Sequence, residues 1–455
     1  MRPYNLRPPL LLLALFVLIP AVFPLEVSGY EANKSAIVLL TAKNQEGKVL
    51  GTGTGFIVKP EGILITNYHV LVDAAEVEAV FSDGRLLPVE RVLKVDRIKD
   101  FAILKLKDGF YSTLEMGNSD LVREFDYNSA LGYLAQSAAR NGGTRNGKIL
   151  QTYGFTLGYL PQADPGFSFI YTTAPFGPGF SGGPLVDKDN KVVGIATVEG
   201  RSINLALPVN YVKPFLSGTK STSLKQLLEQ DKESKEARYY RGNYALYVLG
   251  EPERAVRDFQ EALEMDPDFV LARYDLAAAY ASMRMTRKSI EEYSKVVQLN
   301  PAFPEALSNL GGYYFREGKI EEAVALFEKA IEVHPNFIQA LSNLGAVLNK
   351  LNRPRKALVY LKRALALDPD FGISYFNLGN AHSQLNHWED ALGAYDNAVK
   401  LGVDFLSLHW NRYEIYQKQG KIREAAKELN LILQIDPNNE DARQKLDELT
   451  PKTFR

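Results

Sequence analysis

The sequence predicts a multidomain protein, with an all-β domain in its first half followed by an all-α repeat array in its second half. The chain has 455 residues, which is too long for one ordinary hydrophobic core. From about residue 30 to residue 218, short apolar or alternating runs are separated by Gly, Asn and Asp, as is typical of a β-barrel or β-sandwich. From about residue 224 onward, Ala, Leu, Glu and Lys dominate with a helical period.

The composition argues against several classes of function. The 53 Lys and Arg residues are balanced by 54 Asp and Glu, so the charge does not indicate nucleic acid or an anionic surface as a partner. The chain contains no cysteine, which excludes disulfides, a thiolate nucleophile and cysteine-ligated metals. We expect no nucleic-acid partner, no metal and no cofactor.

The first 29 residues are interpreted as a secretory signal peptide. Arg2 and Arg7 precede an apolar run from Leu10 to about Pro24, and small residues follow that allow cleavage after Gly29. The run is shorter than the ~20 apolar residues of a membrane-spanning helix. An uncleaved N-terminal anchor is the alternative, and only then would the protein reach a membrane. In both cases the rest is extracytoplasmic (periplasmic or secreted), and export without cysteine fits a bacterial protein best.

The all-β domain is expected over residues 30–218, and residues 219–235 are expected to form a linker. The small polar segment SGTKST, Ser217–Thr222, is interpreted as a hinge. Clear strand-like runs in the domain are Ala36–Ala42, Gly55–Val58, Ile63–Thr66, Leu87–Val95, Phe101–Leu106, Phe167–Thr173 and Lys191–Val198.

The second part of the chain repeats every 34 residues. Prolines recur at this step at Pro267, Pro301, Pro335 and Pro369, and small residues do so at Ala255, Ser289, Ala323, Ala357, Ala391 and Ala425. A 34-residue unit of paired helices with this pattern resembles the tetratricopeptide repeat. The resemblance implies a superhelix of six units over residues 236–439, followed by a capping helix and tail over residues 440–455.

One serine of the all-β part lies among closely spaced glycines. In the stretch GPGFSGGPLVDKDNKVVGIA, residues 177–196, Ser181 is surrounded by Gly179, Gly182 and Gly183. Each glycine costs backbone entropy on folding, so the cluster indicates a turn that other residues do not adopt. Such a turn can direct the N–H groups of Gly179 and Ser181 toward one point, as an oxyanion hole requires. The stretch therefore suggests a serine nucleophile, which needs a base.

His69 is the candidate base, because no other histidine precedes residue 334. It closes LITNYH, residues 64–69, a strand-like run followed by a polar step. A single histidine in such a place is more often structural, but its pairing with the glycine-flanked serine favours catalysis. A carboxylate should hold its imidazole. Asp100, directly before FAILKL, is one candidate, and the rivals are Asp73, Asp83 and Asp96.

Three segments together resemble the trypsin-like serine proteases, and more narrowly their bacterial high-temperature-requirement branch. They are GTGTGFIVKPEGILITNYHV, DFAILKL and TTAPFGPGFSGGPLVDKDNKVVGIAT. The resemblance covers about residues 36–216 and implies two six-stranded antiparallel barrels with the site at their junction. It implies His69 as general base, Asp100 as the carboxylate that orients it, and Ser181 as nucleophile. The N–H groups of Gly179 and Ser181 would be the oxyanion donors.

Several positions depart from the family's pattern. Tyr68 precedes the histidine where the family usually has Asn or Ala. Phe180 precedes the serine where the family has Asp or Asn, so activation by an ion pair to a new N-terminal amine is not expected. Phe180 and Pro178 leave open whether the oxyanion hole is permanent or forms when a ligand binds. Pro175 replaces the acid that binds Lys and Arg side chains, so we expect Pro175 to contact a small or apolar P1 residue. Repeats stand where the family has its PDZ domain.

An asparagine column recurs in the first helix of four units, at Asn309, Asn343, Asn377 and Asn411. Side-chain amides carry both a donor and an acceptor, so a row of them along a groove can pair with an extended peptide backbone. The alternative is that these residues belong only to the repeat consensus.

Two functions fit the sequence. The first is an exported serine endopeptidase that cleaves unfolded or partner proteins, with repeats that recruit substrates or regulators. The second is a proteolytically silent protein-binding scaffold. The presence of His69, Asp100, Ser181 and Gly179 together favours the enzyme.

Overall fold

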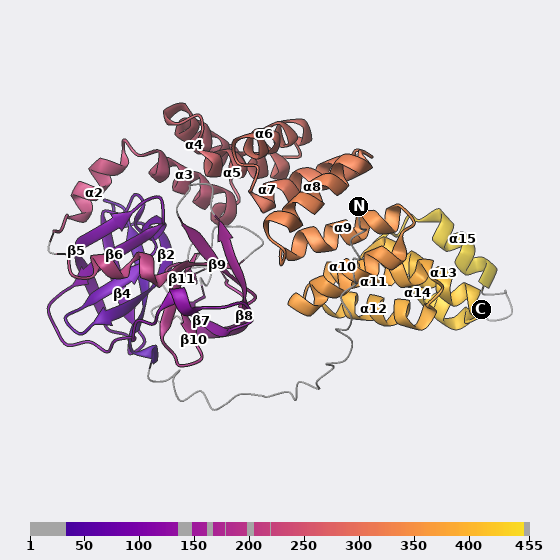
Figure 1. Ribbon diagram of the computed structural model, residues 1–455, viewed down its shortest axis with the longest axis horizontal. Coiled ribbons are helices and arrows are strands. Elements are labelled where there is room, and N and C mark those ends of the chain that lie inside the picture. The colour runs from indigo at the N-terminus through magenta and orange to yellow at the C-terminus, as the bar shows by residue number, and fades with distance from the viewer. Residues whose placement is uncertain are drawn as a thin grey trace, which may run out of the picture.

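The computed structural model of the protein describes residues 33–134, 148–161, 167–177, 179–197, 204–218 and 220–449. The segment interpreted as a signal peptide, residues 1–29, lies outside these ranges. In the described part, two closed six-stranded barrels are followed by an array of antiparallel helix pairs (Figure 1). The all-β domain followed by an all-α superhelix, predicted from the sequence, is confirmed.

The first barrel has the strand order β1-β2-β3-β6-β5-β4, with antiparallel neighbours. Its strands are β1 (Ile37–Lys43), β2 (Val49–Lys59), β3 (Ile63–Thr66), β4 (Glu76–Phe81), β5 (Leu86–Asp96) and β6 (Phe101–Leu106). Every side chain of β6 is buried. Ala102 and Leu104 pack in the cluster of the first barrel, whereas Phe101 and Ile103 join a cluster shared with the second barrel. Both faces of this strand are covered, which explains its uninterrupted apolar sequence.

The second barrel has the strand order β10-β11-β12-β9-β8-β7. Its strands are β7 (Tyr127–Tyr133), β8 (Ile149–Pro161), β9 (Ser168–Thr172), β10 (Pro184–Asp187), β11 (Val192–Thr197) and β12 (Asn204–Pro208). The loop that carries Ser181 leads directly into β10. The end of β3, which leads to His69, belongs to the other barrel, so the two halves of the predicted catalytic site come together only when the barrels pack.

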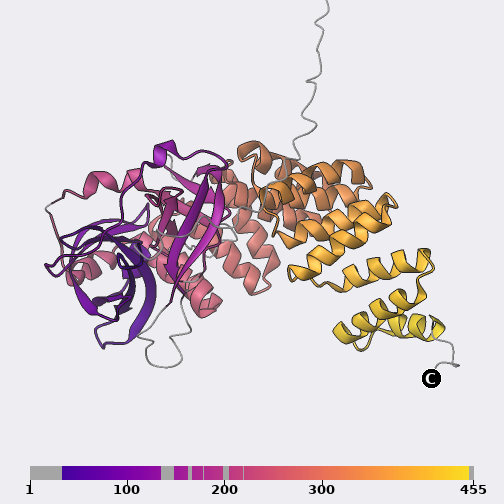
Figure 2. The ribbon, with the colours of Figure 1, turned by 90° about the horizontal axis from the view of Figure 1, so that it is seen from below.

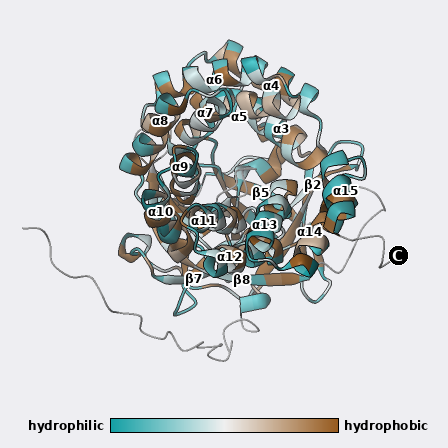
Figure 3. Ribbon diagram, turned by 90° about the vertical axis from the view of Figure 1, so that its right-hand side faces the viewer, coloured by the Kyte–Doolittle hydropathy of each residue, from teal (hydrophilic) through white to brown (hydrophobic). Residues whose placement is uncertain are grey.

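The array begins with helix α2 (Leu224–Asp231), which is followed by six antiparallel helix pairs and a final helix, α15 (Glu440–Leu449). The pairs are α3 (Lys235–Tyr244) with α4 (Pro252–Met265), α5 (Val270–Ser282) with α6 (Thr286–Leu299), α7 (Pro304–Arg316) with α8 (Ile320–Val333), α9 (Ile338–Lys350) with α10 (Pro354–Leu367), α11 (Gly372–Gln384) with α12 (Trp388–Lys400), and α13 (Leu406–Lys418) with α14 (Ile422–Ile435). Viewed from the side, these helices follow a curve, and each carries apolar and polar faces (Figure 3). None of the described helices is long and apolar enough to cross a membrane.

Close approach of the paired helices explains why the repeats need small residues. A Cβ added at Gly345 of α9 would lie 2.5 Å from Leu361 of α10, too close for any real contact. The predicted small-residue column, which includes Ala323 and Ala357, is fully buried at these two positions. Small side chains in both helices of a pair therefore let the helices pack around one large apolar residue.

The segment expected to be a linker is instead packed on the first barrel. Thr222, in the predicted hinge, exchanges two backbone hydrogen bonds with Val92 of β5, at 2.8 and 2.9 Å. Helix α2 then starts with a capping box formed by Ser223 and Gln226, and it buries Leu227 against the first barrel. The sequence of this helix is mostly polar, because only one narrow face of it is covered.

The array contacts the second barrel through the turn between α8 and α9. The side-chain amide of Asn336 donates a 3.0 Å hydrogen bond to the carbonyl of Leu157 in β8. Phe337 and Leu341 are buried in the same cluster as Phe169 and Tyr171 of β9. The array therefore contacts the barrels at its start, through α2, and near its middle, at the turn between α8 and α9, while its C-terminal helices project away from them (Figure 2).

His334 is buried in this second contact, and it makes the stability of the protein depend on pH. Only 5% of the residue is exposed, and its ring lies 5.4 Å from the ring of Tyr171. Burial lowers the pKa of His334 from 6.5 to about 4. Above pH 6.5 the imidazole is neutral in both the folded and the unfolded chain. As the pH falls from 6.5 to about 4, only the unfolded chain takes up the proton, so the free energy of unfolding falls by up to about 3 kcal/mol.

We expect the wild-type protein to lose more stability between about pH 7 and about pH 5 than a His334→Phe variant. Phenylalanine keeps the aromatic contact with Tyr171 but cannot be protonated. Urea unfolding at several pH values gives the two slopes of stability against pH, and the carboxylates, common to both proteins, cancel in the comparison. Identical slopes would show that His334 is not held neutral by burial.

Candidate active site

His69 lies in a short 3₁₀ turn, Tyr68–Leu71, which directly follows strand β3. The preceding residue, Asn67, is fully buried and donates a 2.8 Å hydrogen bond from its side chain to the carbonyl of Asp100. This bond ties the end of β3 to the start of β6. The turn that carries His69 is therefore fixed to the start of β6, the strand that follows Asp100.

The carboxylate of Asp100 holds His69 by two hydrogen bonds. Oδ2 lies 2.7 Å from Nδ1 of the imidazole, and Oδ1 accepts a 2.9 Å bond from the backbone N–H of His69. Asp100 is 1% exposed, and the hydroxyl of Thr197 in β11 donates to it at 3.3 Å. Its φ of +56° lies in the left-handed region, which Asp tolerates better than most residues. A buried carboxylate on Nδ1 fixes the tautomer in which Nε2 is the basic nitrogen.

The three rival aspartates have other partners. Asp73 pairs with Arg241, Asp83 pairs with Arg85, and Asp96 accepts hydrogen bonds from the backbone N–H groups of residues 98 and 99. Among the described aspartates, Asp100 is the one that bonds to His69.

The loop that carries Ser181 packs directly on the first barrel. Gly182 has a φ of +85°, and a Cβ there would lie 2.2 Å from the hydroxyl of Thr66 and 2.8 Å from the backbone nitrogen of Asn67. No other residue fits at this position. The glycine next to the serine is thus required because the loop touches the end of β3, two residues before His69.

Thr54 of strand β2 anchors the same loop, and the sequence analysis did not identify it. Its backbone N–H donates to the carbonyl of Ser181 at 2.8 Å, and its hydroxyl donates to the carbonyl of Gly179 at 2.6 Å. The hydroxyl also accepts a 2.9 Å bond from the backbone N–H of Tyr133 in β7. The only sequence signal was the alternation of Gly and Thr in GTGTG, residues 51–55, which lets the strand approach the loop closely.

The two predicted oxyanion donors lie in this anchored loop. Gly179 has a φ of +97°, a conformation that favours glycine. The carbonyls of Gly179 and Ser181 accept from Thr54, whereas their N–H groups have no acceptor among the described residues. Ser181 is 7% exposed. This arrangement leaves the two N–H groups available for an oxyanion.

The residues that depart from the family's pattern lie as follows. Phe180 is 1% exposed and stacks on Phe176 with an interplanar angle of 11°, so it fills the core of the second barrel. Pro175 lies exposed in the loop between β9 and Ser181. Pro178 lies outside the described residues.

A part of the site that the sequence did not predict comes from the array. The ring of Tyr240, on α3, lies 5.8 Å from the ring of His69 at an interplanar angle of 31° and 5.7 Å from the ring of Tyr68. The next residue, Arg241, makes a bidentate ion pair with Asp73, with its shortest contacts at 2.7 Å. On the other side, Arg97 donates to the fully buried Asp231 of α2 at 2.7 Å. The first helices of the array therefore form one wall around the turn of His69.

The asparagine column lies in the first helices of the last four pairs, as expected, but its amides also bond within the array. Asn309 donates to the hydroxyl of Tyr274 at 3.0 Å, Asn343 donates to Ser308 at 3.2 Å, and Asn411 donates to Asn380 at 2.8 Å. Asn377 is 7% exposed. Asn309 and Asn343 also line a pocket of about 460 Å³, together with Tyr293, Tyr313 and Arg316.

Both parts of the chain match known families. Residues 53–195 match the family described as trypsin-like peptidase domain. Residues 244–284, 303–370 and 360–393 match families described as tetratricopeptide repeat.

Similar proteins match the first part of the chain. The probable periplasmic serine endoprotease DegP-like of Chlamydia pneumoniae is 32% identical over 147 residues, which is 32% of this chain and 28% of that protein. The mitochondrial serine protease HTRA2 of Drosophila virilis is 29% identical over 167 residues, covering 36% of this chain and 38% of that protein. The chain thus spans well under half the length of these relatives. A solved structure of the HtrA-type protease AlgW with a tripeptide aligns with 41% of this chain and 60% of that chain, at 25% identity and a TM-score of 0.35.

The two barrels, the matched families and the sequence relatives thus agree on what the chain combines. It contains a trypsin-like peptidase domain, which is similar to those of high-temperature-requirement proteases, joined to an array of tetratricopeptide repeats.

Proposed function

We propose that this chain is an exported serine endopeptidase that cleaves unfolded or partner polypeptides, and that its repeats recruit those polypeptides or regulators. The observation that carries the proposal is the pair of hydrogen bonds that the buried Asp100 accepts from His69, at 2.7 and 2.9 Å. A histidine held in this way serves as a general base, because the imidazolium that forms is stabilised by the carboxylate.

In the proposed reaction, Nε2 of His69 takes the proton of the Ser181 hydroxyl while the oxygen attacks the peptide carbonyl. The N–H groups of Gly179 and Ser181 stabilise the negative charge that develops on the carbonyl oxygen. His69 then gives its proton to the leaving amine, and water hydrolyses the acyl-enzyme by the same steps. The reaction needs no metal and no cofactor.

Export is supported by the N-terminal segment with Arg2, Arg7 and the apolar run that follows. One relative carries the word periplasmic in its name. We propose that the mature protein is extracytoplasmic and begins after Gly29. N-terminal sequencing of the exported protein tests this: a start at Met1 would favour an uncleaved anchor instead.

We expect Ser181→Ala to lower hydrolysis of an unfolded protein such as casein by at least about a thousandfold, because the nucleophile is lost. The substitution removes one oxygen from a well-packed loop, so the melting temperature should stay close to that of the wild type. Covalent labelling of the wild type by a serine-directed phosphonate, and its loss in Ser181→Ala, reports on the nucleophile directly.

The matched control is Ser119→Ala. Ser119 is also a buried serine of the peptidase domain, but it lies in a turn before β7 and is remote in sequence from all three catalytic positions. Wild-type casein cleavage in Ser181→Ala would contradict the assigned nucleophile. Absence of both labelling and cleavage in the wild type would favour the silent scaffold.

We propose that the asparagine column and the pocket beside Asn309 and Asn343 bind extended polypeptide. Because the amide nitrogens donate within the array, the carbonyl oxygens are the groups that would accept from a peptide backbone. Binding through the backbone would give weak sequence preference, which suits a protease for unfolded chains.

Replacing Asn309, Asn343, Asn377 and Asn411 together by alanine should weaken binding of unfolded casein to the Ser181→Ala protein by about tenfold or more. Fluorescence anisotropy with labelled casein gives the Kd, and far-UV circular dichroism checks that the helices persist. The control replaces exposed Asn430 of α14, which donates only to a carbonyl of its own helix. Unchanged affinity in the fourfold variant would mean that the column serves repeat packing alone.

A further inference from the structure

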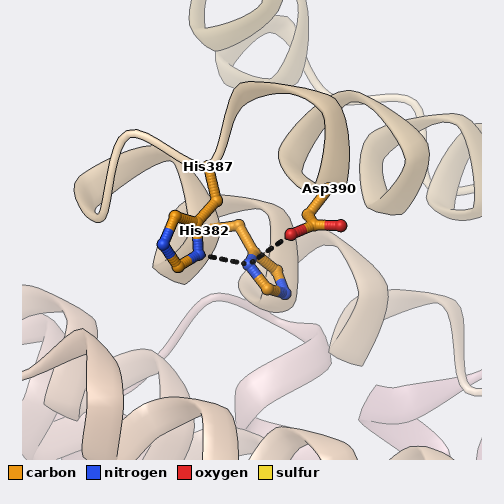
Figure 4. Close-up of side chains that lie close together, drawn as sticks. All are labelled: His382, His387 and Asp390. Atoms are coloured by element: carbon orange, nitrogen blue, oxygen red, sulfur yellow. Dashed lines mark hydrogen bonds and ion pairs between the residues drawn. The ribbon is translucent and has the colours of Figure 1, made fainter.

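Three potential metal ligands meet at the turn between α11 and α12. They are His382 near the end of α11, His387 directly before α12, and Asp390 in the first turn of α12 (Figure 4). The Nδ1 atom of His382 lies 3.5 Å from Nδ1 of His387 and 3.7 Å from Oδ2 of Asp390. All three ligand atoms lie within 4.8 Å of one another. A tetrahedral Zn²⁺ ion with bonds of about 2.0–2.1 Å keeps its ligand atoms about 3.3 Å apart, so small side-chain rotations would complete the site.

The backbone holds these ligands in place. The N–H of His387 donates to the carbonyl of His382 at 2.9 Å, and Asn386 between them has a φ of +59°. The turn is therefore closed by its own hydrogen bond, and both imidazoles leave it on the same side (Figure 4).

Comparison with the other repeats shows that this cluster is particular to one unit. At the position of His382 the other units have Leu246, Tyr280, Tyr314, Leu348 and Tyr416, and at the position of His387 they have Glu251, Met285, Lys319, Arg353 and Lys421. In the third unit, for example, the ammonium of Lys319 lies 4.9 Å from the ring centre of Tyr314. The fifth unit has replaced this kind of contact by two imidazoles and a carboxylate.

The surroundings of His382 also differ from those of the histidine in the next unit. His382 is largely buried, and its Nδ1 atom faces the side chains of His387 and Asp390. The charged groups near it are Asp390 and Lys362. His409 in the next unit differs, because Glu428 and Asp404 occupy both of its nitrogens at 2.6 Å. The hydrogen bond that His409 donates to Glu428 raises the pKa of His409, which favours a protonated ring with no ligand atom.

We propose that His382, His387 and Asp390 form a binding site for a divalent transition metal of the Zn²⁺ class. Three protein ligands leave the fourth position for water or for a donor from a bound polypeptide. The site departs from the expectation of no metal that the absence of cysteine suggested. The metal would fix the turn between the two helices of the fifth repeat.

The test uses the untagged full-length protein, freed of metal by chelation and titrated with zinc chloride in a calorimeter. We expect one zinc per chain whose binding is lost, or weakened at least about tenfold, in His387→Ala and in Asp390→Asn. Both residues are exposed, so neither change should disturb the fold. Glu389→Gln, which removes a neighbouring exposed carboxylate of the same helix, is the matched control and should bind zinc like the wild type.

Cobalt gives a second measurement. Co²⁺ in a four-coordinate site has intense visible bands that a six-coordinate ion lacks, so the wild type should show them and His387→Ala should not. Equal zinc affinity in the wild type, His387→Ala and Asp390→Asn would overturn the proposal, as would loss of binding in Glu389→Gln alone.

A second inference rests on the wall that the array forms beside His69. Tyr240 is 5% exposed, and its hydroxyl donates to the carbonyl of Arg97 at 3.3 Å, so the ring is held at both ends. The preceding residue, Tyr239, is fully buried and donates to Asp275 of α5 at 2.9 Å. Asp275 also accepts from Asn243 and Tyr247. One continuous set of contacts therefore connects the second repeat, through α3, to the catalytic histidine.

We propose that Tyr240 and the Arg241–Asp73 ion pair position His69, so that the peptidase is fully active only while the first repeat is docked. This inference rests on the proposed peptidase activity. A packed aromatic ring restricts the tilt of the imidazole, and small errors in the placement of a base are costly in rate. Arg241 and Asp73 hold the helix and the turn together, at the position where the chain leaves His69.

We expect Tyr240→Leu to lower kcat by about tenfold to a hundredfold with a smaller change in KM, whereas Tyr240→Phe, which keeps the ring, should lose much less. Arg241→Gln and Asp73→Asn should each lower kcat/KM, and the double variant should be no worse than either one. Asparagine is chosen because position 73 has a φ of +62°. Arg254→Gln, which removes an exposed ion pair elsewhere in the array, is the control.

Hydrogen exchange separates failure of this inference from failure of the proposed function. If the array positions His69, amides of residues 68–73 should exchange faster in Arg241→Gln than in the wild type, whether or not any substrate is cleaved. Additive losses in the double variant together with unchanged exchange would overturn the inference.

Discussion

The hydrogen bonds of Thr54 hold the two barrels together at the loop that carries Ser181, the proposed nucleophile. One residue of β2 donates to the carbonyls of Gly179 and Ser181 and accepts from the N–H of Tyr133, and all of these groups belong to the second barrel. Thr54 is fully buried, so water cannot replace a partner that is lost. An unsatisfied buried polar group costs about 1–3 kcal/mol, and here several groups depend on one side chain. His69 and Ser181 belong to different barrels, and Thr54 fixes the loop of Ser181 to the barrel that carries His69.

The array adds a second constraint on the same site. It meets the first barrel through α2 and α3, beside His69, and it meets the second barrel through His334 and Asn336. Two separated contacts resist rotation of the array far better than one would. The relative placement of the two barrels is therefore supported from inside by Thr54 and from outside by the repeats.

Much of this architecture was predictable because it depends on local or periodic signals. Strands β3 and β6 were found at their observed bounds, since both faces of each are covered and their apolar runs are continuous. The repeats were predicted because the small residues that the helix pairs bury recur every 34 residues. Strand β8 was not singled out: it has a bulge near Gly158 and exposes Tyr153 and Phe155, so its apolar pattern is broken. The contact between Tyr240 and His69 leaves no periodic signal at all, because it joins residues 171 positions apart by packing alone. The packing of helix α2 on the first barrel was not predicted either, because most of its side chains are polar and it buries only a narrow face.

The projecting end of the array has a consequence for affinity. Helices α13 to α15 lie far from the barrels (Figure 1), while Tyr240 of α3 lies against the turn of His69. A polypeptide that is held weakly on the distal repeats is confined near the site, and its other segments sample that site at a high effective concentration. The site at the barrels can then bind the polypeptide with low affinity, because confinement raises the concentration of the polypeptide near that site. If the proposed function holds, a chain long enough to reach from the distal repeats to Ser181 is favoured over a short peptide of the same local sequence, and the length of the array then sets a lower limit on the length of a favoured substrate.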